Sequence, residues 1–155
     1  MISGENSIDL RNATYTIGGR TITLVEGRAE AEAAPGSVSK ITTRYFGNEA
    51  HGDMNGDGLE DVAVLLTQEG GGSGTFYYVV AMLQLPVETM GYRSTNEVVL
   101  GDRIAPQTTE LRDGLLIVNY ADRAPGEPMT ARPSVGVSKY LKVENERLVE
   151  TSGRL

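Results

Sequence analysis

Two runs of sequence decide the fold of this 155-residue chain: Val62-Ala63-Val64-Leu65-Leu66-Thr67-Gln68 and Thr75-Phe76-Tyr77-Tyr78-Val79-Val80-Ala81-Met82-Leu83. They are the most apolar stretches of the sequence, and both are rich in the β-branched and aromatic residues that strands favour. The segment between them, Glu69-Gly70-Gly71-Gly72-Ser73-Gly74, suits the tip of a hairpin. The sequence therefore predicts a central β-hairpin whose two strands are buried.

Shorter strands are predicted on both sides of this hairpin. Residues 13–17 and 20–25 alternate in polarity around the Gly18-Gly19 step, which predicts a second hairpin. Residues 108–112 and 115–120 flank an Asp113-Gly114 turn signal and predict a third. The remaining predicted strands cover residues 38–46, 96–100, 135–143 and 147–150.

These segments indicate an all-β domain of about ten short strands. Consecutive hairpins favour an antiparallel meander, which either closes into a barrel or folds into a two-sheet sandwich. The Ala- and Glu-rich residues 26–37 are predicted to be a solvated connector or one turn of helix, and residues 86–95 a loop. We assign residues 1–12 to a loose lead-in, 13–150 to a single β domain and 151–155 to a frayed tail.

The most specific motif, Asp53-Met54-Asn55-Gly56-Asp57-Gly58-Leu59-Glu60-Asp61, stands directly before the first apolar run. Ca²⁺ takes six to eight oxygen ligands, and a short, tightly coiled loop can supply most of them. Gly58 permits the sharp turn, because glycine enters positive φ at little cost. The predicted Ca²⁺ ligands are the side chains of Asp53, Asn55, Asp57 and Asp61 and the backbone carbonyl of Leu59.

Two alternatives compete with a calcium site in this loop. The first is a turn without metal, because Asn, Asp and Gly favour turns for conformational reasons alone. Against it, four acidic side chains within nine residues repel one another unless a cation neutralises them. The second is Mg²⁺, which gives up its water reluctantly and is seldom held by protein ligands alone. The residues therefore favour Ca²⁺.

The loop departs from the EF-hand pattern in two respects. Its twelfth position is Val64, where an EF-hand has a bidentate Glu, and a predicted strand follows it in place of a helix. It resembles the shorter Asp-x-Asn-Gly-Asp-Gly-x-x-Asp loops of FG-GAP repeats and dockerins. The FG-GAP loop runs straight into a strand, so the resemblance implies a calcium loop on a β scaffold.

Three further polar features have weaker signals. Glu49, His51 and Asp53 alternate as on a strand and could hold Zn²⁺ on one face, although a solvated His51 is the simpler interpretation. The glycines of residues 70–74 lack the Lys and the following helix of a phosphate-binding loop. The dipeptide Asp-Arg followed closely by Ala-Pro occurs at Asp102-Arg103 and at Asp122-Arg123.

The two Asp-Arg segments each follow a predicted strand, so both could lie at one end of the sheet. There they would form a polar cluster with Glu110, Glu127 or Arg132. The alternative is that each Arg pairs locally with an Asp and fixes a loop, which the small energy of exposed ion pairs favours.

Composition excludes several classes of partner. The formal net charge is −7 and the pI is about 4.7, which argues against nucleic acid and against an anionic membrane surface. No Cys is present, so disulfides, thiol catalysis and cysteine-bound zinc are absent. No apolar run is long enough to insert across a bilayer. Because calcium loops of modest affinity are useful where calcium is abundant, we expect an extracytoplasmic protein, either periplasmic, cell-surface or secreted.

Most of residues 13–143 also resemble small uncharacterised exported bacterial proteins. The similarity rests on Gly74-Thr75-Phe76-Tyr77-Tyr78-Val79-Val80 and on Gly101-Asp102-Arg103-Ile104-Ala105-Pro106-Gln107-Thr108-Thr109. The resemblance implies export and a single calcium loop, and it implies no reaction.

Two functions of different class are consistent with these residues. The first is a non-enzymatic calcium-binding domain that binds a protein, surface or glycan partner, with no catalytic residues assigned. The second is a hydrolase that uses metal-bound water or paired carboxylates near Asp53–Asp61. The first is favoured because His51 is the only His and no Ser lies in a nucleophile-elbow motif. The partner and the oligomeric state have no signal in the sequence.

Overall fold

The computed structural model describes residues 8–72, 74–86 and 91–152, and in these ranges the chain is all-β with no α-helix. One 3-10 helix, Leu10–Asn12, precedes the strands. The strands are β1 (Thr14–Ile17), β2 (Arg20–Thr23), β3 (Arg28–Glu32), β4 (Lys40–Gly52), β5 (Asp61–Glu69), β6 (Thr75–Gln84), β7 (Tyr92–Ser94), β8 (Val98–Asp102), β9 (Ala105–Arg112), β10 (Leu115–Asp122), β11 (Val135–Glu144) and β12 (Arg147–Thr151).

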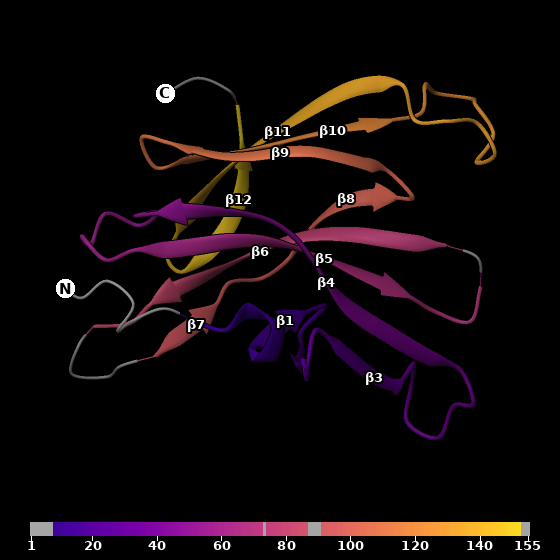
Figure 1. Cartoon of the computed structure of the whole chain (residues 1–155), viewed down its shortest axis with the longest axis horizontal. Coiled ribbons are helices and arrows are strands. Elements are labelled where there is room, and N and C mark those ends of the chain that lie inside the picture. Colours follow the sequence, from indigo (N-terminus) through magenta and orange to yellow (C-terminus); the bar gives the residue numbers. More distant parts are fainter. Residues whose placement is uncertain (1–7, 73, 87–90, 153–155) are drawn as a thin grey trace.

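The strands form three antiparallel sheets stacked in layers. A six-stranded sheet runs β3-β4-β5-β6-β7, with β8 pairing β6 beside β7, and a four-stranded sheet runs β12-β11-β10-β9. The β1-β2 hairpin is a separate two-stranded sheet. Figure 1 shows the four-stranded sheet above the six-stranded sheet, with β1 below it. The six-stranded sheet is therefore the middle layer, and the predicted all-β fold is confirmed as a sandwich, not a barrel.

The predicted central hairpin is confirmed as β5 and β6. Their residues pair antiparallel from Val62 opposite Met82 to Glu69 opposite Thr75. The first seven residues of β5 and the last six of β6 are buried, which requires cover on both faces of the sheet. This explains the unbroken apolar runs, because a strand with one wet face would alternate in polarity.

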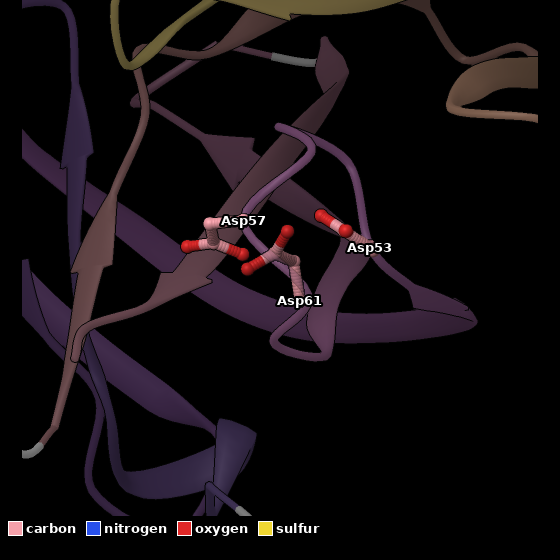
Figure 2. A group of neighbouring side chains, drawn as sticks. All are labelled: Asp53, Asp57 and Asp61. Atoms are coloured by element: carbon pink, nitrogen blue, oxygen red, sulfur yellow. The ribbon is translucent and has the colours of Figure 1, made fainter. Parts of the chain in front are cut away.

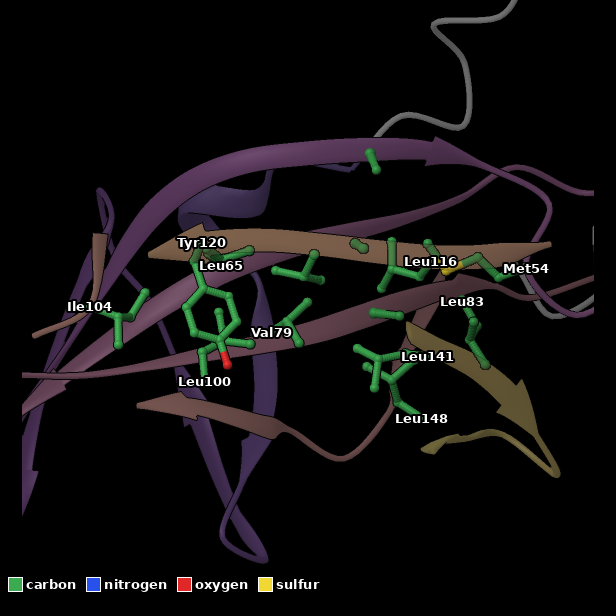
Figure 3. Close-up of a cluster of buried hydrophobic side chains, with 14 residues drawn as sticks. Met54, Leu65, Val79, Leu83, Leu100, Ile104, Leu116, Tyr120, Leu141 and Leu148 are labelled. Atoms are coloured by element: carbon green, nitrogen blue, oxygen red, sulfur yellow. The ribbon is translucent and has the colours of Figure 1, made fainter. Parts of the chain in front are cut away.

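The main core lies between the two large sheets (Figure 3). Leu65 and Val79, from the middle layer, and Val118 of β10 have no exposed surface. Leu141 and Leu148 bring the last two strands into the same cluster. Met54, from the loop before β5, also packs here and is 6% exposed.

A second core fills the other face of the middle sheet. Val64 and Leu66 of β5 pack there with Tyr15 and Leu24 of the first hairpin region. The hydroxyl of Tyr15 donates a 2.7 Å hydrogen bond to the carbonyl of Leu10. The 3-10 helix is thereby held against the hairpin, so the end of the predicted lead-in packs against the domain.

Three predicted boundaries need correction. Residues 28–32, predicted as connector or helical turn, form strand β3, because the exposed edge of β4 supplies its hydrogen-bond partners. Residues 92–94, within a predicted loop, form β7 along the end of β6. The strand predicted at 38–46 continues to Gly52 through two register shifts. The predictions for residues 1–7, 73, 87–90 and 153–155 lie outside the described residues.

The antiparallel pairing of β4 with β5 positions the motif of the calcium prediction. Gly52 pairs with Asp61, so residues 53–60 form the closed loop between two paired strands. Among the described residues no helix is both long and apolar enough to span a membrane.

Candidate metal centre

The loop at 53–60 is folded around the carboxylate of Asp53. Its Oδ1 accepts hydrogen bonds from the backbone N–H of Asn55 at 3.2 Å and of Gly56 at 2.8 Å. Its Oδ2 accepts from the N–H of Gly58 at 2.8 Å. The bond from Gly58 is the main reason that the pKa of Asp53 lies below its usual value, since an N–H dipole favours the ionised form.

Glycine is required at two points of this loop. Gly56 has φ +82° and Gly58 has φ +84°, values that other residues adopt only with strain. No atom lies within 4 Å of the Cβ position of either glycine, so conformation and not crowding selects glycine. The turn role predicted for Gly58 is confirmed.

Asp61 is the buried end of the motif. It has no exposed surface, and its Oδ2 accepts a 2.7 Å hydrogen bond from the N–H of Met54 across the loop. Its Oδ1 accepts a 2.9 Å bond from the N–H of Gln84, at the end of β6. One carboxylate therefore joins the loop to two strands of the middle sheet.

The three aspartates converge inside the loop (Figure 2). Three carboxylate oxygens, one each from Asp53, Asp57 and Asp61, lie within 4.8 Å of one another. Two oxygens that bind one Ca²⁺ at about 2.3–2.6 Å can be at most about 5.2 Å apart, so one ion fits this spacing. The cluster could therefore hold a metal ion.

The electrostatics of the cluster also favour a cation. Burial raises the pKa of Asp61, and the charges of Asp57 and Asp53 raise it further, against the bonds from Met54 and Gln84. No Lys or Arg of the described residues forms an ion pair with any of the three carboxylates. The like charges are thus held together by backbone N–H groups alone.

The other two predicted ligands lie on the same loop. The side-chain oxygen of Asn55 faces the N–H of Asp57 at 3.4 Å, and the N–H of Leu59 donates to Asp57 Oδ1 at 2.9 Å. These contacts coil the segment between Asp53 and Asp61. That Asn55 and the Leu59 carbonyl bind the ion remains a prediction.

Sequence reasoning missed the anchor of the loop, which is Met54. Its side chain is buried in the main core, while its N–H is the donor to Asp61. The signal was present, because Met54 is a large apolar residue between two polar ligand positions. The second donor to Asp61, the N–H of Gln84, carries no such signal, since Gln84 lies 23 residues away from Asp61.

The alternative zinc set does not form. Asp53 turns into the loop, whereas His51 Nε2 lies 3.0 Å from Glu49 Oε1, and Glu49 Oε2 accepts from the hydroxyl of Tyr45. Among the described residues, the one group of three ligand side chains close enough for a metal is the aspartate cluster. Glu49 and His51 instead border a neighbouring pocket.

The two Asp-Arg segments do meet, but through backbone groups. The Arg123 guanidinium, whose side chain is 8% exposed, donates to the carbonyls of Ala131 at 2.8 Å and Arg103 at 3.0 Å. Arg123 thus ties the loop after β10 to the loop after β8. The alternative of local pairing and loop fixation fits this arrangement better than a polar cluster.

Asp102 and Arg103 form a local ion pair with 3.0 Å between Oδ2 and Nη2. Asp102 Oδ1 also accepts from the N–H of Thr75, which fixes the start of β6. The hydrogen bond from Arg103 is the main cause that lowers the pKa of Asp102. Of the predicted neighbours, Glu110 pairs with Arg112, and Glu127 accepts from the N–H of Ala124.

Comparisons with protein-family models, with curated proteins and with solved structures found no match. The site is therefore interpreted from its own geometry.

Proposed function

We propose that this protein is a non-enzymatic calcium-binding domain, exported from the cytoplasm, whose ion stabilises a β scaffold that binds a partner. One observation carries the proposal: oxygens from three aspartate carboxylates, one from each, lie within 4.8 Å of one another, and one of these aspartates is fully buried. Burying a carboxylate among like charges costs free energy unless a cation compensates it. A bound Ca²⁺ would supply that compensation.

The ion would act mainly on the scaffold. Asp53 begins the loop after β4, and Asp61 begins β5 and bonds to the end of β6. A cation shared by these carboxylates would join the ends of three adjacent strands. The ligands supply only oxygen, the donor that Ca²⁺ prefers.

The proposed location rests on the affinity expected for the ion, and the proposed partner class rests on the charge of the chain. Extracellular calcium modules bind with dissociation constants of about 10⁻⁴–10⁻³ M, which suits compartments where calcium is plentiful. The net charge of −7 favours partners other than nucleic acid. The partner we expect is a protein, a surface or a glycan, bound by the loops of a rigid sandwich.

Isothermal titration calorimetry with Ca²⁺, and separately with Mg²⁺, tests the metal assignment. We expect one Ca²⁺ per chain, weaker or no binding of Mg²⁺, and loss of binding in Asp57→Asn. Glu60→Gln is the matched control, because Glu60 is an exposed acid of the same loop outside the predicted ligand set. Equal titration of wild type and Asp57→Asn would contradict the assignment.

A further inference from the structure

A second polar site lies beside the calcium loop. A pocket of about 250 Å³ opens between the 3-10 helix, β4, the start of β5 and β7. Its lining includes Leu10, Tyr45, Glu49, Glu60, Val62 and Tyr92. The pocket is small, so it suits a side chain or a compact molecule and not an extended chain.

The floor of the pocket is apolar. Leu10 and Val62 are both buried core residues that also line the pocket, and Ile8 borders it. Surfaces of this kind hold the hydrocarbon part of a ligand, because contact removes apolar area from water.

The rim of the pocket carries an excess of negative charge. Apart from the predicted metal ligand Asp61, it is lined by three carboxylates, those of Asp9, Glu49 and Glu60, against the Arg11 guanidinium and the His51 imidazole. Low-dielectric walls concentrate such a field and attract ligands of opposite charge. A cationic group is therefore favoured at the rim.

The aromatic wall already holds a cation. The Arg11 guanidinium lies over the ring of Tyr45, with its Cζ 5.3 Å from the ring centroid, and donates to the carbonyl of Glu26 at 3.2 Å. This contact shows that the Tyr45 wall is compatible with positive charge. Tyr92 lines the same pocket.

One carboxylate of the rim is held in place. Glu49 accepts from the Tyr45 hydroxyl through Oε2 and lies 3.0 Å from His51 Nε2 through Oε1. A carboxylate fixed at both oxygens loses little further conformational freedom when a ligand binds.

We propose that this pocket binds a primary ammonium group on an alkyl chain, such as a lysine side chain or a free diamine. The chain lies on the apolar floor formed by Leu10 and Val62, and the ammonium reaches Glu49 and Glu60 at the rim. The site goes beyond the proposed calcium function and does not depend on it.

Solution NMR with calcium at saturation tests the proposal, because an occupied loop cannot itself attract the amine. The probes are Nα-acetyl-lysine N-methylamide, its Nζ-acetylated analogue, 1,5-diaminopentane and 1,5-pentanediol. We expect saturable shifts of the backbone amides of Leu10, Tyr45 and Val62 with the amines. The acetylated and diol probes should bind at least tenfold more weakly.

Two variants locate the site. Glu49→Gln removes the charge but keeps a group that accepts from Tyr45, and Glu60→Gln changes an exposed side chain, so both should fold. Each is expected to weaken amine binding about tenfold, whereas Glu144→Gln, on β11 in the other sheet, should not. Tighter binding of the lysine derivative than of the diamine would identify a protein partner as the source, and the reverse order a free polyamine.

Three results would overturn the proposal. They are shifts confined to residues 53–59, equal affinity for the acetylated probe, and unchanged affinity in both glutamine variants. Because calcium binding is measured separately by calorimetry, failure of the amine site would leave the calcium result unaffected.

Discussion

Replacing Asp57 by alanine should change stability in opposite directions with and without calcium. The Asp57 side chain is exposed and has one described hydrogen bond, from the N–H of Leu59. Without metal, removing its charge relieves repulsion of Asp53 and of the buried Asp61, so the free energy of unfolding should stay equal or rise slightly. With calcium, the same change removes a ligand.

The size of the calcium effect follows from mass action. An ion that binds only the folded state, at a free concentration of ~100 times its dissociation constant, raises the free energy of unfolding by about 2.7 kcal/mol. For a chain of 155 residues, this corresponds to about 5–10 °C in melting temperature. Asp57→Ala should therefore melt about 5–10 °C below wild type in calcium, and at or just above it in chelator.

The assay is a thermal melt of both proteins in excess chelator, in millimolar Ca²⁺ and in millimolar Mg²⁺, with Glu60→Gln as the control. The control should keep the full calcium shift. If wild type and Asp57→Ala respond equally to calcium, or if Asp57→Ala is strongly destabilised in chelator, the loop is an ordinary turn and the reasoning fails.

Three further outcomes follow from the packing. Asp61→Ala should lower the free energy of unfolding by about 1–3 kcal/mol for each of the two backbone N–H groups that it leaves buried without an acceptor. Urea unfolding in chelator should show this loss without metal. Leu65→Ala, in the main core, should cost about 2–5 kcal/mol, whereas Val38→Ala, 95% exposed, should leave the denaturation midpoint unchanged. Asp102→Asn should lower the free energy of unfolding at neutral pH, because the folded-state pKa of Asp102 is lowered. The difference in this free energy between variant and wild type should disappear as pH falls through the range below about 4. Equal differences at pH 7 and pH 2 would contradict this prediction.

Some parts of the structure follow from local sequence. The apolar runs of β5 and β6 have no polar face, so their strands must lie in a layer that is covered on both sides. The glycine-rich segment between them favours a turn. The aspartates meet because alternate positions of a tight loop point inward, and Gly58 supplies the positive φ that the loop needs. Each of these is a property of neighbouring residues.

Other parts are not encoded locally. Strand β3 has an Arg-Ala-Glu-Ala-Glu sequence with weak strand preference, and it forms because β4 offers an unpaired edge. The burial of the site is not encoded locally either. Asp61 accepts a hydrogen bond from the N–H of Gln84, and only the pairing of β5 with β6 brings these two residues together.

The sequence by itself thus determined the all-β class, the central hairpin and the tight aspartate loop, because periodicity and turn chemistry act over a few residues. Only the tertiary structure decided that the sheets stack as an open sandwich, that Arg123 joins two loops, and that Glu49 and Glu60 share a pocket with Leu10. These arrangements depend on contacts between residues far apart in the chain, and the pattern of any one segment does not specify its distant partner.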